Sequence, residues 1–339
     1  MQKLKLTLLL LFLPSMVAEL LSGNAPPARF FQPLWLLIFV LLYGCSCLLI
    51  REARVRWNLQ WSILFLGVAY AIVEEGLTTK AFFNTGWHGT GLLSGYGMCG
   101  GVQWVWAIGV TFGHATGSIL IPVAIAESLW PQLRQEAILK PWMLVLVSGA
   151  VATITLLGML SIGTTEGDRT IPFHPHPTLL VGSALSVACL CWLAYRFRSS
   201  RAATAAVPLL HPAWFFVLAF LSQAFFLVVP NEMAKQGAPG GTAVLVELGA
   251  VLLILLFVFF QLCHREAGKR HITSLILGFL MPYVLLAPVH EFVHKFASGR
   301  NKSGMTAVGI FALIALVAWR RIVLRMEKES VSRPPRCND

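Results

Sequence analysis

Two adjacent glutamates, Glu74 and Glu75, interrupt an apolar segment that spans residues 61–84. Thirteen uncharged residues precede the pair, which places it about 20 Å into a helix that rises about 1.5 Å per residue. Because the hydrocarbon core of a membrane is about 30 Å thick, both carboxyl groups are expected inside it. A carboxylate there costs about 2.5–3.5 kcal/mol, and neighbouring carboxylates repel each other, so at least one should be protonated or bound to a cation. We interpret the pair as functional; in the alternative, Lys80 reaches outward and draws the pair into the polar interface.

A histidine, His114, lies near the middle of a second apolar segment at residues 102–127, with Thr111 and Ser118 on the same helical face. A buried imidazole needs a polar partner. Two interpretations remain open: a hydrogen bond that joins two helices, or a metal ligand or general base.

The third candidate is His290-Glu291-Phe-Val-His294, an HExxH pattern near the end of the apolar segment 271–296. Residues four apart share one face of a helix, so both imidazoles can bind one zinc ion while Glu291 acts as general base. In the alternative, these residues form an amphipathic helix end at the headgroup boundary.

A zinc ion held by His290 and His294 needs a third protein ligand. The only apolar segment that follows offers none, so the ligand must come from Glu74, Glu75 or His114. We expect the glutamates, His114 and His290 about 15, 18 and 9 Å from the outer ends of their helices, all in the outer half of the bilayer. A cation there would also compensate the carboxyl charges.

Two family resemblances follow from these residues. The sequence HEFVHKFA, which contains His290 and His294, resembles the zinc-binding helix of site-two intramembrane proteases. That resemblance implies two zinc ligands and Glu291 as the base. The order Glu74-Glu75, then His114, then a later histidine is similar to the CAAX-protease and bacteriocin-processing family. That resemblance implies a membrane-embedded protease site built from the paired glutamates and the histidines.

The composition predicts an all-α, polytopic bundle of transmembrane helices. Hydrophobic residues make up 57% and charged residues only 12% of the 339 residues, and long apolar runs recur along the chain. We expect one membrane domain over residues 1–327, a polar tail over 328–339, and an uncleaved first helix, with a signal peptide as the alternative. The ten expected spans are 5–22, 32–50, 61–84, 102–127, 141–163, 178–196, 212–231, 242–262, 271–296 and 303–324.

The basic residues alternate between the connecting loops. One set of loops and termini carries 19 Lys and Arg residues and the other carries seven. The positive-inside rule therefore places both termini in the cytoplasm and the protein in the plasma membrane. The net charge of +11 follows this topology, so the lipid bilayer is the expected partner and nucleic acid is not.

Two outer loops carry weaker signals. Residues 84–101 contain seven glycines and form either a flexible lid or a plain connection, which we favour. His174 and His176 lie in a proline-rich stretch, where surface histidines are the simpler interpretation.

These patterns favour a membrane-embedded hydrolase, metal-dependent if zinc is bound, with a Glu/His site in the outer half of the bilayer. Whether the chain is an enzyme stays open from sequence, and the substrate is unknown. The alternatives are a secondary transporter coupled to protons through Glu74 and Glu75, and a protein without chemistry whose buried polar groups only join helices.

Overall fold

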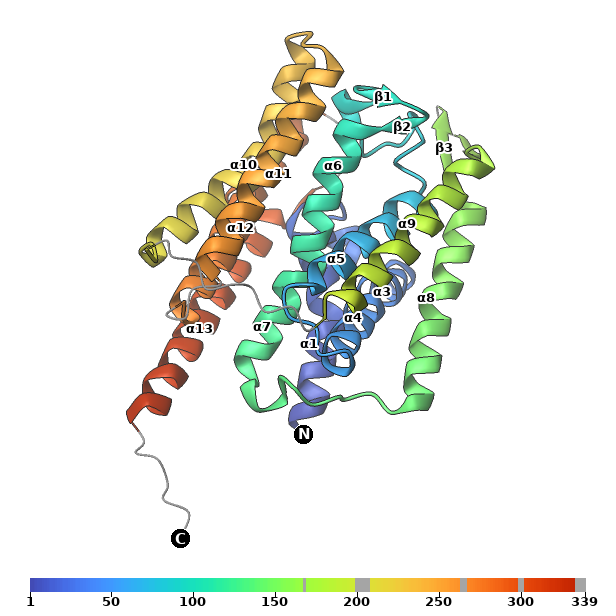
Figure 1. The fold of residues 1–339 in the computed structure, drawn as a ribbon. Helices are drawn as coiled ribbons and strands as arrows, with labels where there is room; N and C mark the ends of the chain where they lie inside the picture. The colour runs from blue at the N-terminus through green and yellow to red at the C-terminus, as the bar shows by residue number, and fades with distance from the viewer. Residues whose placement is uncertain (167–168, 199–207, 263–266, 298–301, 333–339) are drawn as a thin grey trace.

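The computed structural model describes residues 1–166, 169–198, 208–262, 267–297 and 302–332. The chain is an all-α bundle with two small hairpins at one end, as the sequence predicts (Figure 1). The first half contains α1 (Gln2–Ser15), η1 (Met16–Leu21), α2 (Pro27–Phe30), α3 (Pro33–Phe39), η2 (Val40–Gly44), α4 (Cys45–Arg56), α5 (Ile63–Ala71), η3 (Ile72–Thr78), η4 (Gly91–Leu93), β1 (Met98–Cys99), β2 (Val102–Gln103), α6 (Trp104–Gly113), η5 (His114–Leu120), α7 (Ile121–Leu129) and η6 (Pro131–Leu133). The second half contains α8 (Pro141–Ser161), β3 (Gly163–Glu166), β4 (Arg169–Pro172), α9 (Pro177–Arg196), α10 (Pro212–Lys235), α11 (Gly240–Leu262), α12 (Lys269–Ala297) and α13 (Met305–Ser332).

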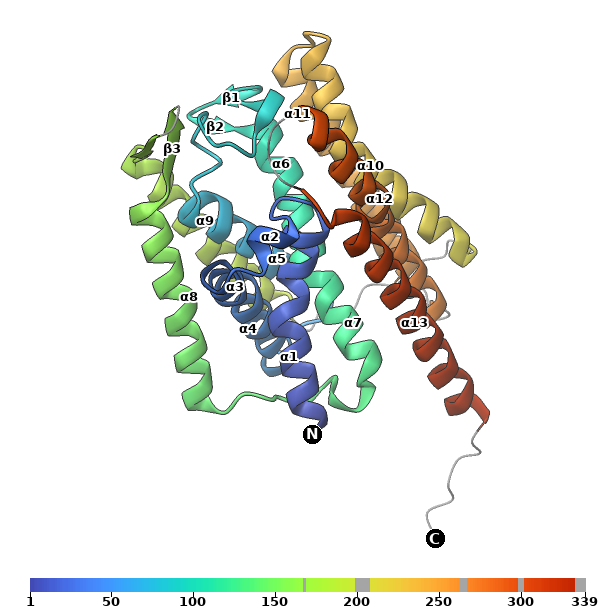
Figure 2. The same ribbon diagram turned by 180° about the vertical axis from the view of Figure 1, so that it is seen from behind.

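The helices form two groups. The elements from α1 to α9 build the larger group, and α10 to α13 lie side by side along one flank of it in both views (Figures 1 and 2). The flank joins the larger group where α11 contacts α6 and α13 contacts η1 and α7. One apolar core, around Leu10 and Tyr43, lies within the larger group, and a second, around Phe279, is shared between the flank and the larger group, which contributes Val17 and Ile121.

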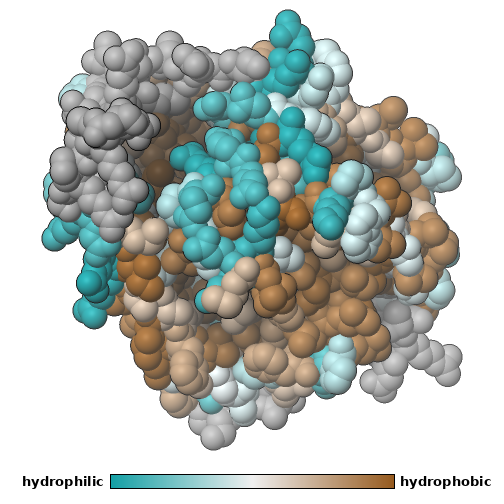
Figure 3. Space-filling view, turned by 90° about the horizontal axis from the view of Figure 1, so that it is seen from below, coloured by the Kyte–Doolittle hydropathy of each residue, from teal (hydrophilic) through white to brown (hydrophobic). Residues whose placement is uncertain are grey.

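The outer surface fits a lipid environment. Leu146, Leu185 and Leu253 are 63%, 65% and 69% exposed on three different helices. Seen from the end where α1 begins, hydrophobic residues cover much of the molecule, and hydrophilic residues gather nearer the middle (Figure 3). Exposed apolar surface of this extent is typical of a membrane interface.

Nine helices of the described residues are long and apolar enough to cross a membrane. The one predicted span without a counterpart among these nine is 61–84. Its helix comprises only α5 and η3 and ends at Thr78. The expected helix end at residue 84 is therefore wrong, because the chain turns at Lys80 with a left-handed backbone conformation (φ 59°). Glu74 and Glu75 consequently lie about one turn from the end of their helix, closer than predicted.

The N-terminus and the last described turn of α13 lie at the same end of the molecule, and the two hairpins lie at the other end (Figures 1 and 2). An even number of crossings requires this arrangement. The cytoplasmic location of that end stays a prediction from the charge distribution.

Lys80 does not reach outward, so the alternative placement of the glutamate pair based on its snorkelling is wrong. The side chain is buried, and its Nζ donates hydrogen bonds to the carbonyl oxygens of Met159, Ile162 and Phe173 at 2.6, 2.6 and 3.0 Å. Two of these carbonyls belong to the C-terminal end of α8, where a cation is electrostatically favourable. This contact fixes the loop that follows the glutamate pair.

The glycine-rich loop 84–101 is tied down by one buried side chain. Nε2 of Gln103 donates to the carbonyl oxygens of Ala81 and Asn84 at 2.9 and 3.0 Å, and its Oε1 accepts from the amide of Gly95 at 2.7 Å. This anchoring favours the interpretation of the segment as a connecting loop.

At the end of the molecule opposite the hairpins, arginines of α4 form structural contacts in addition to their expected role in topology. Arg54 lies 3.0 Å from a carboxylate oxygen of Glu127, and Arg51 lies 2.9 Å from one of Glu52. Arg51 also donates to backbone carbonyls of the connection between α7 and α8, including that of Glu136 at 2.7 Å. The end of α4 thereby holds this connection in place.

Candidate functional site

Four π-helical segments, which are all those in the described part of the chain, bring polar residues into one cluster. The segments are η1, η2, η3 and η5, and each interrupts or ends a transmembrane helix. They carry Glu19, Tyr43, the pair Glu74 and Glu75, and His114 respectively. A π-turn inserts an extra residue and re-aims side chains, and such turns are frequent at functional sites.

His114 lies between the two glutamates. Its Nδ1 is 3.1 Å from Oε2 of Glu74, and its Nε2 is 3.2 Å from Oε1 of Glu75. Ser118, one turn further along η5, places its Oγ 3.2 Å from the same Nδ1. Glu74, Glu75 and His114 are only 2%, 6% and 8% exposed. The structure therefore brings together the first two sequence candidates, although 39 residues separate Glu75 from His114.

The helices can approach each other here because Gly67 faces η5. A Cβ atom at Gly67 would lie 3.2 Å from the backbone oxygen of Ala115, which is closer than ordinary van der Waals contact. Thr79 orients the carboxylate of Glu75, because its Oγ1 donates a hydrogen bond to Oε2 of Glu75 at 3.2 Å. Local packing thus sets both the spacing of α5 from η5 and the direction of the carboxylate.

A third carboxyl and two tyrosines complete the cluster. The hydroxyl of Tyr43 donates to Oε1 of Glu19. The rings of Tyr43 and Tyr70 lie 5.9 and 6.3 Å from the imidazole of His114, between centroids. Neither tyrosine is predicted as a site residue from the sequence, where the only signal is an isolated Tyr within an apolar segment.

Two buried atoms of the cluster lack a hydrogen bond to any described residue: the hydroxyl of Tyr70 and Oε2 of Glu74. The latter lies 3.1 Å from Nδ1 of His114, which also contacts Oγ of Ser118 at 3.2 Å. Unsatisfied polar atoms are rare in protein interiors and often mark a catalytic role or an ion.

The three residues at the centre fit a metal ion by donor type and spacing. Glu74, Glu75 and His114 each offer one ligand atom, and these atoms lie within 4.8 Å of one another. Carboxylate oxygen and imidazole nitrogen are established zinc ligands. Two buried carboxyls and the half-buried one of Glu19, close to one imidazole, also leave negative charge that protons or a divalent cation must compensate.

The HExxH residues lie on α12 and have other contacts. Oε1 and Oε2 of Glu291 accept hydrogen bonds from the backbone amides of Gly304 and Thr306, at 3.1 and 2.7 Å, next to the start of α13. The ring of His290 packs against Gly23, which follows η1. His294 belongs to α12, but its side chain lies outside the described residues. The zinc-ligand and base roles that HExxH predicts for these residues stay predictions.

Two surface histidines stabilise helix starts. Nδ1 of His176 accepts from the amide of Thr178 at 3.4 Å, and Nδ1 of His211 accepts from that of Ala213 at 3.3 Å. Each is the N-cap residue directly before α9 or α10, where free backbone amides of the first turn need acceptors. A structural role is the simplest account of these two imidazoles.

Comparison with known proteins places the chain in a family. A family model described as "Uncharacterized membrane protein family" matches residues 8–330. The chain belongs to this family. The match agrees with the polytopic fold and gives no support for either protease resemblance. No curated protein and no solved structure matches the chain.

Proposed function

We propose that this membrane protein is a membrane-embedded hydrolase, and that Glu74, Glu75 and His114 form its active site around a zinc ion. The observation that carries the proposal is the contact of one imidazole with two buried carboxylates, at 3.1 and 3.2 Å, inside a transmembrane bundle. Such an arrangement is costly unless a cation or shared protons compensate it. Carboxylates and histidines that are brought together in this way are typical of hydrolytic sites.

The residues divide the chemistry between them. Zinc, when bound, supplies a Lewis acid that makes its bound water nucleophilic near neutral pH. Glu74 and His114 would hold the ion, and Glu75, which lies 3.2 Å from His114, is placed to accept a proton from water and to return it to the leaving group. Tyr43 holds the Glu19 carboxyl beside them through a hydrogen bond. Because the cluster lies within the helices, its substrate would be a bond in a membrane-inserted molecule.

The metal test uses the purified protein after dialysis against Zn²⁺. We expect one zinc ion per chain in the wild type, and loss of most of it in Glu74→Gln and His114→Ala. His176→Ala is the matched control, because His176 caps α9 at the surface. The double variant His290→Ala, His294→Ala tests which residues bind the ion. If this variant loses zinc while His114→Ala retains it, the metal belongs to HExxH and the proposed site is wrong.

The hydrolysis test uses protein reconstituted with a membrane extract, with newly formed α-amino groups labelled and identified by mass spectrometry. Wild type should generate new ends that Glu75→Gln generates at least about 100-fold more slowly, since a removed general base or ligand costs this much. Equal products from both proteins would refute a peptidase function. Hydrolysis by a protein that contains no metal would support the hydrolase function and contradict the role of zinc in it.

A proton-coupled transporter is the second candidate. The enclosure of Glu74 and Glu75, at 2% and 6% exposure, favours it because buried carboxyls in contact with a histidine also form proton relays. Proton flux in proteoliposomes separates the two candidates: flux that Glu74→Gln abolishes, without any hydrolysis product, would select transport.

A further inference from the structure

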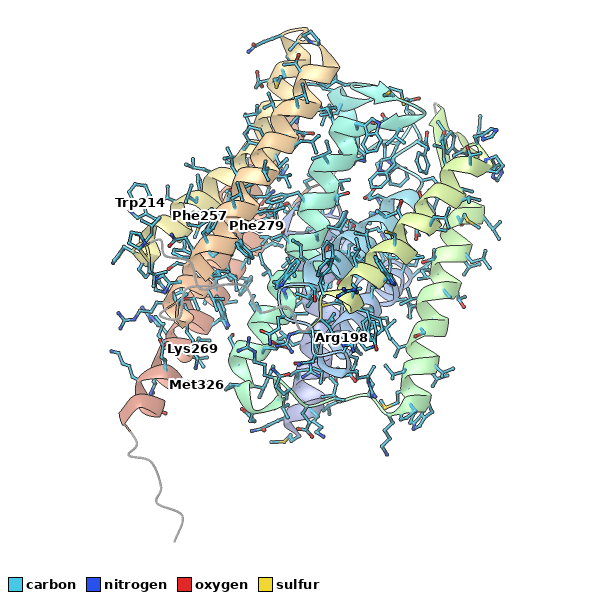
Figure 4. All side chains as sticks on the ribbon, in the orientation of Figure 1. Arg198, Trp214, Phe257, Lys269, Phe279 and Met326 are labelled. Atoms are coloured by element: carbon cyan, nitrogen blue, oxygen red, sulfur yellow. The ribbon has the colours of Figure 1, made fainter. Side chains whose placement is uncertain are left out.

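A second polar site lies far from the cluster in the chain, between the beginnings of α10 and α12 and the C-terminal half of α13. It is a pocket of about 490 Å³ whose lining includes five cations, Arg270, Arg320, Arg321, Arg325 and Lys328. Figure 4 labels Lys269 and Met326, which neighbour lining residues on α12 and α13 and lie at this end of the flank. Its size is in the range of small-molecule sites.

Most of the cations that line the pocket have no carboxylate partner in the part of the chain that the structure describes. Arg325 pairs with Glu329 at 3.0 Å. Among the residues that the structure describes, the other four cations form no ion pair with a carboxylate. Nε of Arg320 is buried and has no hydrogen-bond partner there. Clustered cations with a free buried donor match an oxyanion such as a phosphate group.

An apolar hollow continues from this pocket. It has a volume of about 300 Å³, shares His211, Pro212 and Arg320 with the pocket, and is lined further along by Phe216 and Val217. Val217 is 39% exposed on the outer side of α10. A polar end that opens into an apolar hollow on the lipid-facing flank fits a ligand with an anionic head and a hydrocarbon chain.

We propose that this pocket binds the phosphate headgroup of an anionic phospholipid, with the beginning of an acyl chain in the hollow beside Phe216. The position supports a lipid as the occupant, because the pocket lies at the end of the helices that carries most basic residues. Basic pockets between helices on that side of a membrane are known to take anionic headgroups. The site is independent of the Glu/His cluster and of the function proposed for it.

The experiment measures lipid retention by native mass spectrometry of the full-length protein from nanodiscs of phosphatidylglycerol and phosphatidylcholine in equal amounts. Wild type should retain phosphatidylglycerol in at least about tenfold excess. The variants Arg270→Gln and Arg320→Gln/Arg321→Gln should lose that preference. Two variants are used because Arg320 is half-buried, and its replacement alone is a risk to folding.

The matched control is Lys140→Gln/Arg196→Gln, which removes two exposed cations outside the pocket. It should keep the wild-type preference. Equal retention of both lipids by the wild type would overturn the proposal, and so would an equal loss in the control, since any basic residue would then suffice. A third arm adds inorganic phosphate: binding of phosphate without retention of phosphatidylglycerol would identify a free anion as the ligand and also overturn it.

Discussion

At the residue scale, buried charges in this protein are compensated in different ways. Lys80 has three backbone oxygens around its ammonium group. Glu74 and Glu75 share one imidazole, with a third carboxyl nearby. Lys80 is thus fully satisfied by the protein itself, whereas the carboxyl cluster leaves charge for a proton or cation. This difference indicates a structural role for Lys80, and it is the reason why we propose a functional role for the cluster.

Replacement of Lys80 by methionine should therefore destabilise the protein without abolishing activity directly. Three buried carbonyl oxygens would lose their donor, which costs about 1–3 kcal/mol of unfolding free energy. The measurement is the midpoint of thermal or denaturant unfolding in detergent. Lys235→Met is the control, because its exposed ion pair with Glu232 at 2.6 Å contributes at most about 1 kcal/mol. Equal shifts in the two variants would contradict the structural role of Lys80.

Glu291 provides the second residue-scale prediction. Because its carboxylate accepts two amides beside the start of α13, Glu291→Gln should lower stability by about 1 kcal/mol, as loss of a helix cap does. Hydrogen exchange at the amides of Gly304 and Thr306 should speed up, while zinc content stays unchanged.

Glu329→Gln, at the other end of α13, serves as the control for that experiment, since Glu329 makes an exposed ion pair. A large loss of hydrolysis in Glu291→Gln, with unchanged exchange at the two amides, would instead support the base role predicted by HExxH.

At the element scale, the cluster depends on close crossings between helices. Gly44 ends η2, directly after Tyr43, and a Cβ there would overlap the backbone carbonyl of Leu11 in α1. This crossing keeps Tyr43 within hydrogen-bond reach of Glu19. The distance between α1 and η2 is therefore a condition for the third carboxyl to join the site.

Gly44→Ala should force the two helices apart. Overpacking costs about 1–3 kcal/mol, so the unfolding midpoint should fall, and any zinc binding should weaken with it. Gly149→Ala is the matched control, because Gly149 lies within α8 and a Cβ there meets no atom within 4 Å. That substitution should be neutral or slightly stabilising, as Ala is favoured in helices. A stable Gly44→Ala protein with unchanged metal content would show that the crossing tolerates separation.

At the scale of the whole molecule, the N-terminus and the last described turn of α13 lie at the same end, which agrees with an even number of crossings (Figures 1 and 2). The short helix formed by α5 and η3 is not among the nine candidate spans of the described residues, so its crossing of the membrane stays a prediction. It is about 24 Å long, and the buried turn at Lys80 continues it.

Reporter fusions test the orientation. The 19-to-7 asymmetry of basic residues predicts that reporters at either end of the chain are active in the cytoplasm. The control is a reporter inserted at Gly91 in the loop between η3 and α6, which should be active only on the outer side. Activity of the terminal reporters outside the cell would reverse the topology and place the Glu/His cluster in the inner half of the bilayer.

The sequence by itself determined the all-α polytopic fold, most span boundaries and the central residues Glu74, Glu75 and His114. These features are readable because hydrophobicity and the cost of a buried charge are local properties of each segment. Only the tertiary structure decided that these residues meet, that Glu19 and Tyr43 join them, that Lys80 points inward and that Glu291 contacts the start of α13. Those facts depend on which helices pack side by side and how closely, and on π-turns that rotate side chains. A one-dimensional pattern of apolar and polar residues does not specify such lateral contacts.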